Sequence, residues 1–285
     1  MSRTNILGSA GPDGVNAEPF AHLVHGPVLP AELYAELASA FPDQAMILGD
    51  RRGKENASAR LPAFMVAEDR RIPQLWQEFF AFHTSAEFWR EIVRVFGPAL
   101  RRTFPGMEQQ AGRPMEQWKA GARRDRKEKD DLDLRLDCQF VINTPARQLT
   151  ASVKTQHVDK LTTILSMLYY FRDPEDRSEG GDLEMYSWKH TPRFLPHRMV
   201  LPRDLALTRV VRYAPNTLVA FVNSEQSVHG VSPRGASSLP RRYVNFIVEI
   251  PFKAFATPKL GIAERVMHWP ETRRLSMRDI GGDRY

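Results

Sequence analysis

Gln156-His157-Val158-Asp159 is the stretch on which the interpretation of this 285-residue chain depends. His157 and Asp159 are two residues apart, and on an extended backbone this spacing places both side chains on the same face. An imidazole and a carboxylate on one face can converge on a single metal ion. The pattern is weak when it stands alone, because a histidine two residues before an aspartate occurs by chance in many proteins.

A third ligand is available in a strand-like segment further along the chain. His229 lies in Ser227-Val228-His229-Gly230-Val231, shortly after the apolar run 218–222. Two histidines and one carboxylate on one face of an octahedral ion form the facial triad that binds non-haem Fe(II) and leaves positions open for O₂ and a co-substrate. The sequence therefore predicts that the metal ligands and catalytic residues are His157, Asp159 and His229.

Five segments in a fixed order resemble a known family. They are HVD at 157–159, LYYF at 168–171, GGDLEMY at 180–186, NTLVAFVNSEQSVHGVSP at 216–233 and RRYVNF at 241–246. In this order they resemble 2-oxoglutarate- and Fe(II)-dependent dioxygenases of the prolyl 4-hydroxylase-like group. The resemblance covers roughly residues 136–252 and is fainter upstream, over 18–42.

The resemblance implies hydroxylation of an unactivated C–H bond, with release of succinate and CO₂. The implied cofactors are Fe(II), 2-oxoglutarate as co-substrate, and O₂. We expect a small-molecule substrate such as an amino acid, a sugar or a natural-product intermediate. A protein side chain, as in prolyl hydroxylation, is the alternative substrate. A non-catalytic jelly-roll module and a cupin-type isomerase are the alternative functions, and 2-oxoglutarate turnover separates them from an oxygenase.

Three arginines, Arg234, Arg241 and Arg242, are candidates to bind the distal carboxylate of 2-oxoglutarate. By strand alternation Arg242 shares its face with the apolar residues at 244, 246 and 248, whereas Arg241 shares a mixed face. We expect the apolar face to line the barrel interior, where a buried guanidinium requires an anion. Arginine binds carboxylates through two parallel hydrogen bonds. The sequence therefore predicts Arg242 as the anchor, with a structural ion pair as the alternative.

Tyr170 matches a position at which related dioxygenases bind the same carboxylate through a phenol. A buried hydroxyl needs a hydrogen-bond partner, and the carboxylate would supply one. Tyr169 is the alternative, because the strand register could differ by one residue. The neighbouring Gly180-Gly181 pair predicts a tight turn in a hairpin.

Strand-like runs dominate the second half of the chain. A mainly β fold with α, a double-stranded β-helix (jelly roll, cupin-like), is predicted because so many short strands follow one another. Helices expected at 30–41 and 72–102 would brace it, and 48–61 is expected to be a loop. We predict a single dioxygenase domain over 1–285, with a mostly helical support portion at 18–117 and a jelly-roll core at 134–252. The predicted strands are 134–143, 155–159, 162–171, 181–188, 207–213, 217–223, 227–231 and 242–250.

Composition restricts the partners and the location. The net charge is +6, and basic residues near 122–128 alternate with acids, which indicates a solvated segment rather than a nucleic-acid interface. The basic surplus favours an acidic substrate. The chain has no apolar run long enough for a membrane span and no signal-peptide core at its start. Cys138 is the only cysteine, so an intrachain disulfide is impossible and a cytoplasmic location is expected. The sequence does not determine the oligomeric state.

Overall fold

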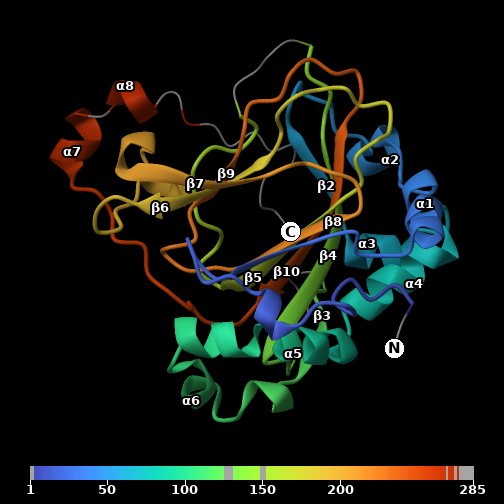
Figure 1. The fold of residues 1–285 in the computed structure, drawn as a ribbon, viewed down its shortest axis with the longest axis horizontal. Helices are drawn as coiled ribbons and strands as arrows, with labels where there is room; N and C mark the ends of the chain where they lie inside the picture. Colours follow the sequence, from blue (N-terminus) through green and yellow to red (C-terminus); the bar gives the residue numbers. More distant parts are fainter. Residues whose placement is uncertain (1–2, 125–130, 148–151, 268, 273–274, 276–285) are drawn as a thin grey trace.

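The computed structural model describes residues 3–124, 131–147, 152–267, 269–272 and 275 (Figure 1). Its centre consists of two β-sheets, the larger with the order β1-β8-β5-β10-β4-β2 and the smaller with the order β7-β6-β9. Strand β3 pairs with β4 in parallel, whereas the other pairings are antiparallel. The strands are β1 His22–His25, β2 Ser58–Pro62, β3 Ala120–Ala122, β4 Leu134–Asn143, β5 Thr163–Tyr170, β6 Leu183–Trp188, β7 Leu205–Val211, β8 Thr217–Val222, β9 His229–Val231 and β10 Arg241–Glu249.

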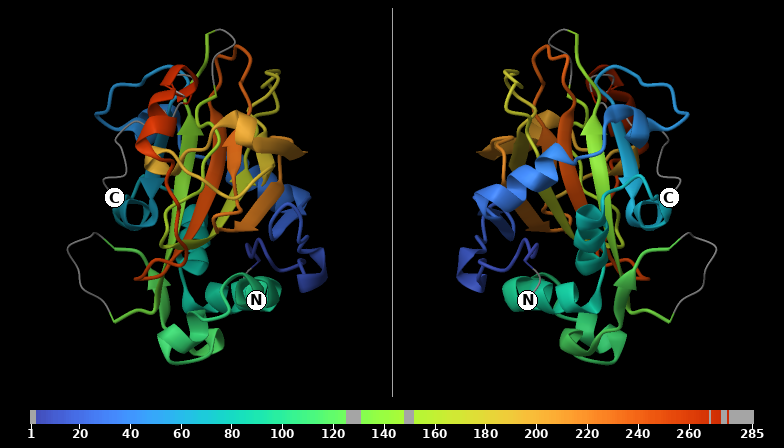
Figure 2. Two further views of the ribbon diagram at one scale, coloured as in Figure 1. Left: turned by 90° about the vertical axis from the view of Figure 1, so that its left-hand side faces the viewer. Right: turned by 90° about the vertical axis from the view of Figure 1, so that its right-hand side faces the viewer.

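Helices cover the outer face and one end of the larger sheet. Figures 1 and 2 show α5 and α6 across one end of the long strands. Among the described residues, no helix is long and apolar enough to cross a bilayer. The helices are α1 Ala31–Ser39, α2 Gln44–Leu48, α3 Ala63–Glu68, α4 Gln74–His83, α5 Ala86–Thr103, α6 Met107–Ala111, α7 Ile262–Met267 and α8 Trp269–Thr272. Short 3-10 helices span Pro12–Gly14, Met115–Gln117, Pro196–Arg198 and Pro202–Asp204.

The amphipathic helix α5 illustrates why these segments are helical. Ser85 caps it by accepting a hydrogen bond from the backbone N–H of Phe88 at 3.3 Å. Its apolar residues recur at helical spacing and are buried. Trp89 on this face stacks on Trp118 with ring centroids 5.7 Å apart. This burial, rather than helix propensity, fixes α5 against the sheet.

The larger sheet packs one face against the helices and turns the other toward a cavity. On the helix side, Trp76 of α4 meets Phe140 of β4 with ring centroids 4.6 Å apart. On the opposite side, alternate residues of β10, among them Tyr243 and Asn245, line a cavity of about 380 Å³ together with residues of the smaller sheet. The cavity therefore lies between the two sheets, inside the barrel that they form.

Most expected elements are present, and two segments differ. The predicted mainly β fold with α is confirmed by the two facing sheets. Residues 58–62, expected to be part of a loop, form β2, because their backbone pairs with β4. Residues 155–159, expected to be a strand, contribute only isolated bridges from His157 to His229 and Met199. The portion 125–128 of the basic segment lies outside the described residues.

Candidate metal and co-substrate site

The structure brings the three predicted metal ligands together at the cavity wall. The Nε2 atoms of His157 and His229 lie 3.7 and 3.8 Å from Oδ1 of Asp159. One ligand atom from each residue lies within 4.8 Å of the other two. The backbone explains this proximity, because His157 and His229 exchange two hydrogen bonds of 3.0 Å across an antiparallel bridge.

Both imidazoles are oriented by backbone carbonyl groups. Nδ1 of His157 lies 2.7 Å from the carbonyl oxygen of Thr155, and Nδ1 of His229 lies 2.9 Å from that of Ser227. Each Nδ1–H can donate to its carbonyl, which leaves the Nε2 lone pair facing the carboxylate. Nε2 of His157 is buried and has no hydrogen-bond partner in the described part of the chain. Burial lowers the pKa of both histidines, so both are neutral and able to bind a metal.

Asp159 completes the set as an ionised carboxylate. Burial would raise its pKa, but the ammonium group of Lys154, 3.5 Å from Oδ1, helps to hold that pKa well below the usual range. Its Oδ2 accepts a hydrogen bond of 2.7 Å from Ser166, whose hydroxyl accepts one of 2.9 Å from Asn223. Oδ1 is thereby directed toward the imidazoles. The two imidazoles and the carboxylate, together with the hydrogen bonds that orient them, therefore fit a divalent metal ion.

Arg242 lies on the opposite side of the sheet from the cavity, so the expectation that it faces the interior is wrong. Its Nε donates to the carbonyl oxygen of Phe171 at 3.1 Å, and Nη2 lies 3.1 Å from Oδ2 of Asp173. The alternation of side chains along the strand was predicted correctly, but the apolar face packs on the helices. The ring centroid of Phe246 lies 6.1 Å from that of Phe79 of α4. The interior face of β10 is the more polar one.

Arg241 occupies the position that was expected for Arg242. Its side chain is 1 % exposed, and Nε donates to the carbonyl oxygen of Gly181 at 2.7 Å. Nη1 donates to Oδ1 of Asn143 at 3.4 Å, whereas Nη2 is buried without a partner among the described residues. The guanidinium carbon lies 4.9, 4.7 and 4.8 Å from the ring centroids of Tyr170, Tyr213 and Tyr243. This is a buried cation with an unused donor.

Tyr170 lies beside this cation, whereas Tyr169 does not. Tyr170 is paired with Tyr243 across β5 and β10, and its hydroxyl is buried with no hydrogen-bond partner in the described structure. Burial raises the pKa of Tyr170 to about 12, so the phenol keeps its proton and can donate it. Tyr169 points to the helix side and donates to Oδ1 of Asn216 at 2.6 Å. Arg241 and Tyr170 thus leave one buried donor each for an anion.

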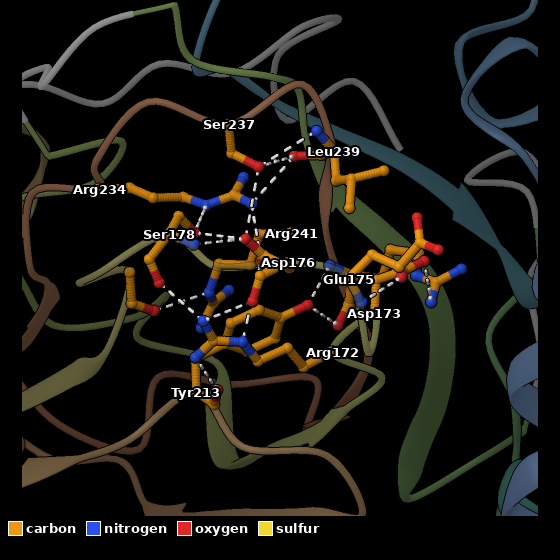
Figure 3. A network of polar contacts seen from close by, with 12 residues as sticks. Arg172, Asp173, Glu175, Asp176, Ser178, Tyr213, Arg234, Ser237, Leu239 and Arg241 are labelled. Carbon is orange, nitrogen blue, oxygen red and sulfur yellow. Dashed lines mark hydrogen bonds and ion pairs between the residues drawn. The ribbon is translucent and has the colours of Figure 1, made fainter.

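A second buried arginine supports the turn that holds Arg241, as Figure 3 shows. Arg234 pairs with Asp176 at 2.9 Å and donates to Oγ of Ser178 at 3.0 Å. The turn at Gly180 lies against Pro233. A Cβ on Gly180 would lie 1.9 Å from the carbonyl oxygen of Pro233. Arg234 therefore stabilises the position of the segment 176–181, and this holds the Gly181 carbonyl oxygen where it accepts a hydrogen bond from Arg241.

Sequence reasoning missed two contributors to the site and did not select a third. Lys154 and Ser166 belong to no motif, and only the fold brings them to Asp159. Arg241 was considered and set aside. The signal that could have identified it was its shared face with Tyr243, since a mixed polar and aromatic face suits a ligand cavity better than a helix-covered core.

One family model matches the part of the chain that contains these residues. Residues 148–248 match the model of the 2OG-Fe(II) oxygenase superfamily. No curated protein matches the chain in sequence. Similar solved structures include a prolyl-4-hydroxylase from Pseudomonas putida, with 13% identity, a TM-score of 0.44, and 88% of this chain and 100% of that chain covered. A prolyl 4-hydroxylase from Phytophthora capsici has 12% identity, a TM-score of 0.47, and coverages of 96% and 73%. AviO1 from Streptomyces viridochromogenes Tue57 has 15% identity, a TM-score of 0.43, and coverages of 88% and 96%.

Proposed function

Since residues 148–248 match the model of the 2OG-Fe(II) oxygenase superfamily, we propose that the chain hydroxylates an unactivated C–H bond of a small molecule. The expected enzyme class, a 2-oxoglutarate-dependent dioxygenase, and the expected use of Fe(II), 2-oxoglutarate and O₂ are confirmed by that match and by the His-Asp-His cluster. His157, Asp159 and His229 would hold Fe(II), and Arg241 with Tyr170 would hold the distal carboxylate of 2-oxoglutarate.

One observation carries the assignment of the anchor. Within the described residues, Nη2 of Arg241 and the hydroxyl of Tyr170 are buried donors without partners on the interior side of the barrel. Leaving such groups unpaired costs about 1–3 kcal/mol each, and more for a charged group. A carboxylate between them would satisfy both. Arg242 offers no such vacancy, because Asp173 and the Phe171 carbonyl already occupy its guanidinium.

Different side chains of the cavity would have different roles in the reaction. Bound Fe(II) supplies the activation of O₂ that is coupled to decarboxylation of 2-oxoglutarate to succinate and CO₂. Ser166 keeps one oxygen of Asp159 engaged, so that the other remains directed at the metal position. Arg241 fixes the orientation of the co-substrate. Leu168, Leu183 and Phe221 contribute apolar wall to the cavity and limit access of water to it.

A small molecule is favoured over a protein side chain as the substrate. The cavity of about 380 Å³ must hold both the co-substrate and the reacting group, which restricts the substrate to a modest size. Hydroxylation of a protein side chain is the second candidate function, because the side chain of a single residue is small enough to enter the cavity. A cytoplasmic location stays a prediction from the sequence.

Succinate formation tests the proposal directly. The Fe(II)-loaded protein is incubated with 2-oxoglutarate, O₂ and a panel of amino acids, sugars and short peptides, and succinate and hydroxylated product are quantified. We expect equal amounts of both with a small-molecule member of the panel and no turnover by the His229→Ala variant. Turnover confined to peptides would transfer the assignment to a protein hydroxylase. Undiminished turnover by His229→Ala would refute the metal site.

A further inference from the structure

Two basic side chains line the cavity directly beside the metal position. Lys160 follows Asp159 in the chain, and Arg198 lies against Val158, the residue between the two ligands. The backbone N–H of Val158 donates to the carbonyl oxygen of Arg198 at 3.1 Å, and Nε of Arg198 donates to the carbonyl oxygen of Val158 at 3.3 Å. Both cations are therefore held at the segment that carries His157 and Asp159.

The ammonium group of Lys160 and the two Nη atoms of Arg198 are unused donors within the described structure. Neither the ammonium group of Lys160 nor the Nη atoms of Arg198 make a hydrogen bond or an ion pair there. Other cations of the same cavity are paired: Arg123 lies 3.6 Å from Asp137 and 3.3 Å from Glu249. The ammonium group of Lys154 lies 3.5 Å from Asp159. Lys160 and Arg198 therefore differ from their neighbours in having unused donors.

The backbone that presents Arg198 is strained. His197 and Arg198 have φ angles of 60° and 61°, in the left-handed region that residues with a Cβ rarely adopt. Each such residue costs on the order of 1–2 kcal/mol, and such strain gathers at ligand sites. The segment is nevertheless held in place, because the N–H of Val200 donates to the carbonyl oxygen of Gln156 at 3.0 Å. The chain thus maintains an unfavourable conformation that places a guanidinium beside the metal ligands.

Among the described residues that line it, the cavity carries excess positive charge. Its acidic lining residues are Asp159 and Glu249, and Asp137 lies behind Arg123, where burial raises its pKa to about 6. The two positive charges of a divalent metal ion and the two negative charges of 2-oxoglutarate would cancel. An excess of positive charge remains even with all three acids ionised, and it favours an anionic occupant. The five basic lining residues are Arg60, Arg123, Lys154, Lys160 and Arg198.

We propose that the organic substrate is a small molecule with a carboxylate or phosphate group, which binds to Lys160 and Arg198 next to the metal position. This inference rests on the proposed function and names its substrate class. The anionic group would satisfy the free donors through charge-assisted hydrogen bonds. It would also fix which C–H bond of the substrate faces the metal.

Matched pairs of compounds test the substrate class. Amino acids and hydroxy acids are compared with their primary amides, and sugar phosphates with the parent sugars, so that the two arms distinguish a carboxylate from a phosphate. Binding to the anaerobic enzyme loaded with Fe(II) and 2-oxoglutarate is followed through its visible charge-transfer absorption, and succinate formation is measured in air. We expect at least one acid to bind and to be turned over, with a neutral counterpart at least tenfold weaker. Preference for neutral compounds, or no binding of any acid at millimolar concentration, would overturn the inference.

Variants test the two cations. Lys160→Ala and Arg198→Ala should each raise the KM of the accepted acid about tenfold or more, the loss expected for one charge-assisted hydrogen bond. Lys160→Arg and Arg198→Lys should recover part of this loss. Lys253→Ala, an exposed lysine that does not line the cavity, is the control and should leave KM unchanged.

Two further readouts separate this inference from the proposed function. Iron content and the Kd for 2-oxoglutarate should stay at the wild-type values in Lys160→Ala and Arg198→Ala. An unchanged KM for the acid in the double variant would overturn the inference, while the oxygenase assignment would stand. Failure of the wild-type protein to bind Fe(II) and 2-oxoglutarate would instead contradict the proposed function itself.

Discussion

Replacing Arg241 tests the anchor most sharply, because the adjacent Arg242 provides a matched control on the other face of the same strand. Arg241 is 1 % exposed, so its interaction with an anion is little weakened by solvent. Nε and Nη1 donate to Gly181 and Asn143, which leaves Nη2 without a partner in the described structure and free to donate to an anion. The proposed role therefore gives this residue one charge-assisted hydrogen bond and one buried charge pair with the co-substrate.

The expected magnitudes follow from these contacts. Arg241→Lys keeps the charge but cannot bind the Gly181 carbonyl and the carboxylate together, and loss of one charge-assisted bond costs about 1.5–3 kcal/mol. The Kd for 2-oxoglutarate should then rise roughly 10- to 150-fold. Arg241→Ala removes one partner of a buried pair, at about 3–5 kcal/mol, so the Kd should rise by about two orders of magnitude or more. Tyr170→Phe removes a single donor and should raise it roughly tenfold.

Calorimetric titration of 2-oxoglutarate into the Mn(II)-loaded protein measures these constants without turnover. Metal content and the urea unfolding midpoint of every variant show whether the fold survives. Arg242→Ala should bind 2-oxoglutarate within twofold of wild type, because its partners Asp173 and Phe171 lie away from the cavity. A large loss in Arg242→Ala with none in Arg241→Ala would refute the reasoning about the two faces of β10.

The remaining predictions concern metal, backbone and pH. Single alanine variants of His157, Asp159 and His229 should bind less than about a tenth of one Fe(II) per chain, as measured by metal analysis of the folded proteins. Full iron content in any variant would contradict the role of that residue as a ligand. Gly180→Ala should lower the free energy of unfolding, measured by urea denaturation, by more than about 2 kcal/mol. Its Cβ would clash with the carbonyl oxygen of Pro233, and its φ of +73° is unfavourable for alanine. Gly11→Ala has open space and an extended backbone, so its change should stay within about 0.5 kcal/mol. His83 is buried with its pKa lowered from 6.5 to about 3. Because the unfolded chain binds this proton first, the stability due to neutral His83 should fall as the pH drops below 6.5, by up to about 2 kcal/mol at pH 5. His83→Gln should remove that part of the pH dependence, and an unchanged slope of the unfolding free energy against pH would contradict it.

Local patterns in the chain predicted most of the elements, because they depend on neighbours in sequence. Alternation over 134–143 predicted β4 at its observed bounds, and helical spacing predicted α1 to within a few residues and the run 72–102 that contains α4 and most of α5. The three candidate ligands were also identified by sequence, from their chemistry and their order. Strand β2 could not be predicted, since Ser58–Pro62 is extended only through its pairing with β4.

Which face of β10 turns inward was decided by the tertiary structure alone. The sequence determined that Arg241 and Arg242 lie on opposite faces, because side chains alternate along any strand. It did not determine which face the helices would cover. Phe246 and its apolar neighbours are buried more completely against α4 and α5 than they could be in a cavity that must admit water, metal and charged ligands. The polar face was therefore left for the interior, and with it Arg241 rather than Arg242.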